Sequence, residues 1–180
     1  PFASGRRNHD RSFDVHLTVT KEGKYIPAIS IGLRDFVGTG WYSSEYITAS
    51  KKFSALEITT GIGFGRLAGY DTFKNPLSIF SSDFNNRKKT THSLGGSFSN
   101  MNWFGGKASP IVGFNYYIGK DVSLSAEYSP DSMLHEKAYT EINSRWNYGL
   151  NYRINNYLNV SAQQLYGSTF SITASILANP

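Results

Sequence analysis

Apolar and polar residues alternate along most of the chain, which is the period-two pattern of β-strands whose two faces differ in chemistry. The clearest run is 145–154, where aromatic and aliphatic side chains alternate with Arg, Asn and Gly. Helical spacing is nearly absent, so the pattern predicts an all-β fold. It predicts about nine strands, at residues 13–20, 28–34, 43–51, 55–64, 110–118, 122–128, 145–154, 157–165 and 169–177.

The links between these strands are alternately short and long, and the long ones are 35–42, 66–108 and 129–143. Because several links are too short for a crossover, the strands are predicted to be antiparallel. An up-and-down meander then gathers the tight turns at one end and the long loops at the other, as in outer-membrane barrels. The link at Gly167 departs from this pattern, since it is tight where a long loop is due.

Composition limits the class of protein. The 180 residues suffice for one domain, predicted to span 1–180, with its strands within 13–177. The lack of cysteine excludes disulfides, Cys-ligated zinc and thiol nucleophiles. No stretch approaches the roughly 18 consecutive apolar residues of a membrane-spanning helix. A net charge of +5, scattered along the chain, argues against a nucleic-acid partner.

The polar faces of the predicted strands mix Gly, Ser, Thr and Asn with isolated charges, as in a hydrated lumen crossed by ion pairs. The apolar faces of the strongest strands carry no charge, and one Arg or Lys at mid-bilayer would cost about 2–4 kcal/mol. Tyrosine and tryptophan gather near strand ends, where an interfacial belt would place them: Trp41, Tyr42, Tyr116, Tyr117, Trp146, Tyr148 and Tyr157. These features favour an outer-membrane β-barrel over a soluble sandwich or lipocalin-like barrel, which stays open as the alternative.

An odd number of strands does not suit a free-standing bacterial barrel. Either the segment Leu94 to Trp103 supplies a further strand, or this chain is part of a larger barrel, and the second interpretation is favoured.

Several segments carry a family signature: PAISIGLRDFVGTGWYSSEYITASKKF (27–53), GIGFGRL (61–67), Asn75–Pro76, Gly95–Gly96 and SRWNYGLNYRINNYLNVSAQQL (144–165). Together they resemble the YjbH family, also called GfcD-like, which accompanies exopolysaccharide and capsule operons. The resemblance implies a β-barrel lipoprotein of the bacterial outer membrane that takes part in secretion or assembly of an extracellular polysaccharide. It implies membrane lipid, lipopolysaccharide, the polysaccharide and other export proteins as partners. Family members are much longer, and their lipid-modified cysteine is missing here, as expected of a fragment or of a chain without that anchor.

Arg34 and Asp35, at the end of the second predicted strand, are the first candidate site. Arg34 could project into the lumen and hydrogen-bond sugar hydroxyls or an acidic uronate, with Asp35 orienting it. The structural alternative is an Arg–Asp pair that only fixes the strand end. Four further charged residues stand at polar positions of the alternation, so we expect them on the polar face of the strands. They either line a sugar-conducting channel or brace the barrel by pairing across it: Glu57, Glu127, Arg145 and Arg153.

The link 66–108 is too long for an unstructured connection, so we expect it to be ordered in part, either inward as a plug or outward towards a partner. Its Arg87, Lys88, Lys89 run could meet lipopolysaccharide phosphates or an acidic polymer, or be a solvated loop tip.

The alternative function is a soluble periplasmic or extracellular β-domain that binds polysaccharide without spanning the membrane. An outer-membrane lipid- or glycan-modifying enzyme is the weaker alternative. The pairs His92–Ser93 and His135–Glu136 lie in predicted loops, and His16 stands near Asp14, but none forms a convincing set of nucleophile, base and orienting acid. Glycoside hydrolysis by the carboxylate pair Glu57 and Glu127 stays open, because the sequence does not give their separation. No metal-binding spacing such as HExxH occurs, so no catalytic residue, metal or cofactor is expected.

Overall fold

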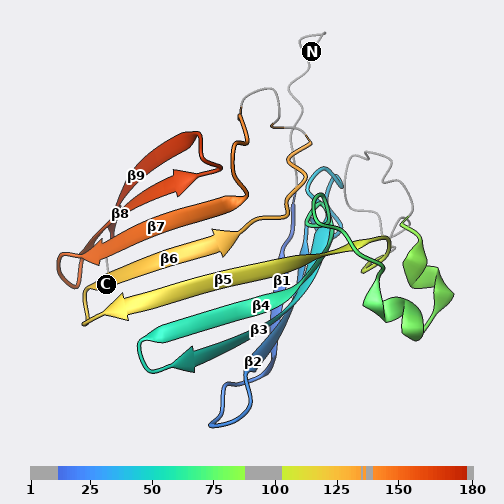
Figure 1. Cartoon of the computed structure of the whole chain (residues 1–180), viewed down its shortest axis with the longest axis horizontal. Helices are drawn as coiled ribbons and strands as arrows, with labels where there is room; N and C mark the ends of the chain where they lie inside the picture. Colours follow the sequence, from blue (N-terminus) through green and yellow to red (C-terminus); the bar gives the residue numbers. More distant parts are fainter. Residues whose placement is uncertain (1–11, 88–102, 135, 137–139, 178–180) are drawn as a thin grey trace.

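The computed structural model describes residues 12–87, 103–134, 136 and 140–177. It confirms the all-β antiparallel prediction, since all nine strands join in chain order into one sheet (Figure 1). Each strand begins and ends within two residues of its predicted limits. The strands are β1 (Val15–Thr20), β2 (Ala28–Arg34), β3 (Ser44–Phe53), β4 (Leu56–Gly65), β5 (Ala108–Ile118), β6 (Val122–Tyr128), β7 (Trp146–Arg153), β8 (Leu158–Leu165) and β9 (Thr169–Ile176).

The links sort to the two ends of the sheet as predicted, because every strand runs antiparallel to the next. The short links 21–27, 54–55, 119–121 and 154–157 form what we call the turn end. The links 35–43, 66–107 and 129–145 form the loop end. The tight β8–β9 link also lies there, and Tyr166 and Gly167 in it have φ of 56° and 70°. This left-handed conformation reverses the chain within a few residues.

Register gives the sheet one apolar and one polar face. Along one row of the apolar face, Phe53, Leu56, Tyr116, Leu124, Leu150, Ala162 and Ile172 stand side by side across seven strands. The next row, on the opposite face, holds Lys52, Glu57, Asn115, Ser125, Gly149, Gln163 and Ser171. The alternation read from the sequence therefore continues from strand to strand.

The sheet curls but does not close into a barrel. In the described part of the chain, β1 and β9 are its two edges and each pairs with only one neighbour. Figure 1 shows β1–β4 turning away from the fan of β5–β9. The meander is thus confirmed, and a barrel complete within this chain is not formed. Each edge keeps a row of backbone groups able to pair with another strand.

Most of the apolar face is bare. Tyr148 is 52% exposed and Phe170 is 69% exposed, and the buried apolar residues of the described chain are only Phe64, Ala108 and Met133. Trp146 and Leu150 are also exposed, so these strands do not enclose a core of their own. Over the described residues, no helix has the length and apolar character to cross a membrane.

Two charged residues stand on the apolar face, and both are engaged. Lys51 donates to the Gly23 carbonyl and pairs with Glu22 at 3.3 Å, both in the turn after β1. Glu45, only 1% exposed, accepts from Arg87 Nη1 at 2.7 Å, Arg87 Nη2 at 2.9 Å and Phe104 N at 2.9 Å. The apolar surface between these two positions is free of charge.

The link 66–107 wraps around the loop end of β5. Its first residues cross the polar face, where Ser109 Oγ donates to the Tyr70 carbonyl. Phe73 then pairs with Ala108, and the chain makes two 3₁₀ turns, η1 (Pro76–Ile79) and η2 (Ser82–Asn85). It returns on the apolar face, where Phe104 packs edge-on against Phe64 with ring centroids 5.5 Å apart. The described part of the link therefore contacts both faces of the sheet at this end, and its role as a plug or as a partner-binding segment stays a prediction.

The basic run and the extra strand are only partly described. Arg87 is no solvated loop tip, since it is held by Glu45. Lys88 and Lys89 lie outside the described residues, as does all of 94–103 except Trp103.

The side chains predicted for an aromatic belt do not all lie on the apolar face. Trp146 lies on the apolar face, stacked 6.4 Å from Phe114 and edge-on to Tyr128. Tyr117 instead lies on the polar face, because its hydroxyl donates to Glu57 at 2.8 Å. Tyr42 faces the Arg66 guanidinium at 4.7 Å. For these two tyrosines the belt prediction is wrong, since a polar partner fixes each ring.

Candidate functional site

Arg34 and Asp35 occupy one strand end without pairing. Asp35 is buried at φ 53°, its N–H donates to Asp14 Oδ1, and its Oδ2 accepts from the Tyr42 N–H, both at 2.9 Å. It therefore shapes the loop 35–43 rather than orienting its neighbour. Arg34 is exposed on the polar face, and within the described residues no hydrogen bond or ion pair engages its guanidinium. Of the two, Arg34 has the donors available to a ligand.

The other four predicted residues all have local partners and do not come together. Glu57 accepts from Tyr117, and Glu127 accepts from Asn147 Nδ2 at 3.4 Å. Arg153, at the turn end, pairs with Asp121 at 3.3 Å. Arg145 donates to the Asp131 carbonyl at 2.9 Å and covers the Tyr70 ring at 3.1 Å. Whether any of them touches a sugar stays a prediction.

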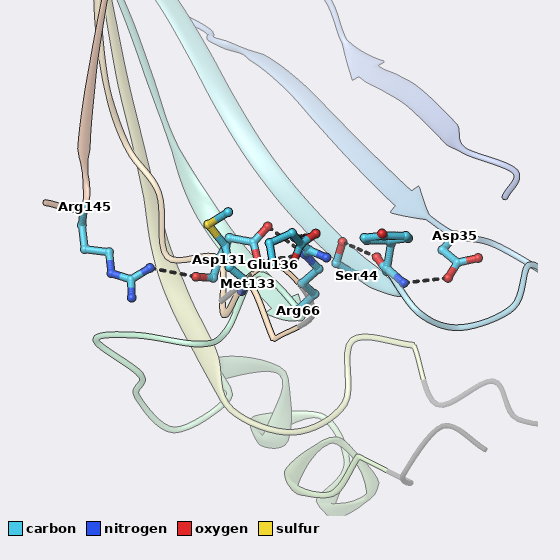
Figure 2. Close-up of polar contacts among 8 residues, drawn as sticks. Asp35, Ser44, Arg66, Asp131, Met133, Glu136 and Arg145 are labelled. Atoms are coloured by element: carbon cyan, nitrogen blue, oxygen red, sulfur yellow. Dashed lines mark hydrogen bonds and ion pairs between the residues drawn. The ribbon is translucent and has the colours of Figure 1, made fainter. Parts of the chain in front are cut away.

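A cluster around Arg66 was not predicted as a site. Arg66 Nε donates to the two Asp131 oxygens at 2.8 and 2.9 Å, and Nη2 donates to Glu136 Oε1 at 2.8 Å (Figure 2). Its side chain is 14% exposed. Burial alone would lower the Arg66 pKa, but the hydrogen bonds that Arg66 donates to Asp131 and Glu136, with the negative charge of both carboxylates, outweigh it and raise that pKa. The cluster joins the links after β4 and β6, which are far apart in sequence.

Backbone contacts complete this junction. Ser132 N–H donates to the Arg66 carbonyl at 3.0 Å, and Gly69 N–H donates to the Pro130 carbonyl at 3.1 Å. A Cβ at position 69 would lie 2.4 Å from Ser132 Cα, so only glycine permits this approach. We call residues 66–71 and 129–133 together the rim bridge. It crosses the polar face at the loop end.

Two cavities flank the rim bridge. The rim cavity, of about 330 Å³, is lined by Ser12, Asp14, Arg34, Asp35, Tyr42, Arg66 and Asp131. The face cavity, of about 450 Å³, draws its lining from β2 to β6, including Tyr46, Thr59, Asn115 and Glu127. Because residues of neighbouring strands from β2 to β6 line one cavity, the sheet is concave on its polar face. Arg34 borders both cavities.

The cavities suit recognition of polyhydroxylated ligands. Arginine donors, carboxylate acceptors, hydroxyls and aromatic rings lie together, and apolar side chains such as Leu67 and Ile111 complete the face cavity. His16 Nδ1 lies 3.0 Å from the Tyr46 hydroxyl, so this ring nitrogen already has a hydrogen-bond partner. His92, Ser93 and His135 lie outside the described residues. Within the described chain, no group of three or more His, Asp or Glu residues is placed to hold a metal ion.

The sequence carried one signal for the unpredicted cluster. Arg66 lies in the GIGFGRL segment (61–67), which resembles a known family. Asp131 and Glu136 lie in a loop without periodicity, and nothing in the sequence links them to Arg66.

Comparisons with known proteins agree with the resemblance. The chain is 29% identical over 180 residues to a protein of Escherichia coli (strain K12) named "Uncharacterized lipoprotein YjbH". The match covers 99% of this chain but 26% of that relative, so the chain spans about a quarter of its length. No solved structure matches. A family model described as "Exopolysaccharide biosynthesis protein YbjH" matches residues 2–180, and the chain therefore belongs to the YjbH family.

Proposed function

We propose that this chain is one part of an outer-membrane β-barrel that helps secrete or assemble an exopolysaccharide, without catalysing a reaction. The observation that carries the proposal is the bare apolar face of the sheet, opposite a polar face that contains both cavities. The family description supplies the exopolysaccharide, and the named lipoprotein relative supports a place in the cell envelope.

The dimensions of the apolar face support contact with lipid. From Glu45 to Lys51 along β3 is six residues, or roughly 20 Å at about 3.3 Å per residue. The apolar band of outer-membrane barrels is about 25 Å tall. Each large side chain on this face would gain about 1.5–3 kcal/mol from leaving water. A face of this size left in water would be strongly unfavourable.

The soluble polysaccharide-binding domain receives less support. Such a domain needs a second layer over its apolar face, and the described chain supplies cover only near Phe64 and Ala108. In the proposed barrel, membrane lipid contacts this face, lipopolysaccharide surrounds the loop end, and other export proteins meet the ends of the strands.

The experiment uses the full-length protein in cells that make its exopolysaccharide. Ser125 and Leu124 are both exposed but lie on opposite faces of β6. Ser125→Cys is nearly isosteric, and this chain has no cysteine of its own. A bulky, membrane-impermeant thiol reagent should label Ser125→Cys and lower the polysaccharide at the cell surface at least severalfold. Leu124→Cys is the matched control and should keep normal export after the same treatment.

Unlabelled Ser125→Cys, or labelled Ser125→Cys with unchanged export, would contradict the proposal. Equal loss of export from both variants would also contradict the proposal, because it requires that only labelling of the polar face affects export.

A further inference from the structure

The arginines at the loop end differ in whether another group of the protein binds their guanidinium. Arg66 is held by two carboxylates, Arg87 by Glu45, and Arg145 by the Asp131 carbonyl and the Tyr70 ring. Arg34 alone among the arginines described there has no polar partner. Its guanidinium offers five N–H donors in a planar fork that matches a carboxylate.

The position of Arg34 makes those donors accessible. It lines both the rim cavity and the face cavity, so a chain molecule lying along the polar face passes it. The volumes of about 330 and 450 Å³ fall within the usual range for small-ligand sites, about 300–1,000 Å³.

Tyr46 gives the face cavity a flat aromatic surface next to Arg34. On the paired strands, Arg34 faces Ser44 and Gly32 faces Tyr46, so Arg34 and Tyr46 are diagonal neighbours on the polar face. The Tyr46 ring lies over Gly32, where a Cβ would be 2.1 Å from it, and its hydroxyl meets His16. Glycine at position 32 thus lets the ring lie flat, with a face able to pack against the C–H side of a sugar.

The rest of the lining combines hydrogen-bond acceptors with apolar side chains, which include Leu67, Ile111 and Val112 in the face cavity. Asp14 and Asp131 line the rim cavity, and Glu127 and Asn115 line the face cavity. Several carboxylates surround one free guanidinium, so a ligand with many negative charges at one point would be repelled. A ligand with one carboxylate and several hydroxyls on each ring satisfies both kinds of group.

We propose that Arg34 and Tyr46 form a binding site for an acidic sugar of the uronate class, with Arg34 holding the carboxylate and Tyr46 packing against the ring. The inference rests on the proposed function, because it names the substrate class of the same polar face. Phosphate on a lipid is disfavoured, because the site lies on the face opposite the apolar one.

The test measures binding to the full-length protein in detergent micelles, with tri-galacturonate as the acidic probe and neutral galactotriose as its match. Tri-galacturonate should bind at least about tenfold more tightly than galactotriose, as a charge-assisted fork implies. Arg34→Ala should weaken tri-galacturonate about tenfold and leave galactotriose unchanged. Tyr46→Ala should weaken both ligands.

Arg153→Ala is the matched control, since it also removes one arginine from the polar face but at the turn end of the sheet. It should leave tri-galacturonate binding unchanged. Equal binding of the two probes, an inert Arg34→Ala, or an equal effect of Arg153→Ala would overturn the site. Because binding is measured in micelles, those outcomes leave the export experiment to judge the proposed function separately.

Discussion

Removal of Arg66 should open the rim bridge while leaving the sheet intact. In Arg66→Ala, Asp131 and Glu136 lose three charge-assisted hydrogen bonds of 2.8–2.9 Å. The two carboxylate side chains, 15% and 30% exposed, are left close together without their cation. The loop 129–136 then loses its main attachment to the segment after β4.

The magnitude follows from the number of bonds and their exposure. Hydrogen bonds to charged groups contribute about 1.5–3 kcal/mol each, and breaking a buried pair costs about 3–5 kcal/mol. Since water reaches both carboxylates in part, we expect a loss near the lower limit, about 3 kcal/mol. Local opening of the rim bridge would become roughly 150-fold more frequent.

Amide hydrogen exchange of the full-length protein in micelles measures that opening. The N–H groups of Gly69 and Ser132 donate across the rim bridge and should exchange roughly 150-fold faster in Arg66→Ala. Amides within β7 and β8 should not change. Arg153→Ala, which breaks an exposed pair, should change exchange by no more than about fivefold. The reasoning is refuted if Gly69 and Ser132 exchange as in the wild type, or if the whole sheet opens equally.

Two further substitutions test the packing. Gly61→Ala should lower the midpoint of thermal unfolding, because the added Cβ would lie 2.2 Å from the Ile47 carbonyl oxygen. Gly113→Ala is the control and should leave the midpoint nearly unchanged, because its Cβ would lie 3.9 Å from the nearest atom. Equal midpoints for the two variants would contradict this expectation. Arg87→Ala should cost about 3 kcal/mol of local stability, because it leaves the Glu45 carboxylate buried without a counter-charge, and protease cleavage within 76–87 should rise. Unchanged cleavage would show that Glu45 does not anchor this segment.

The strands and their links could be predicted because both depend on local order in the sequence. Alternation along 145–154 fixes which side chains share a face, and short links such as 119–121 allow only antiparallel pairing. The same local order placed Arg34 on the polar face. It could not show that Arg34 lacks a partner, because Asp35 turns away to hold the loop 35–43.

Contacts between segments far apart in the sequence could not be predicted from local order. The residues Arg66 and Asp131 are 65 positions apart, and Arg87 and Glu45 are 42 apart. Glu45 stands on the apolar face, where alternation predicts an apolar residue, and only the returning link explains its burial. Closure into the proposed barrel would need strands that pair with the edges β1 and β9, and no pattern within this chain specifies them.

Contact between the apolar face and lipid would place this sheet in a membrane, and spin labels on β6 report that contact residue by residue. Labels placed one at a time at Ser123, Leu124, Ser125 and Ala126 of the full-length protein in lipid vesicles would be probed with oxygen and with a water-soluble nickel complex. We expect accessibility to alternate with a period of two, with oxygen favoured at Leu124 and Ala126 and nickel favoured at Ser123 and Ser125. Low accessibility to both reagents at Leu124 and Ala126 would mean that protein covers this face, and would contradict the account.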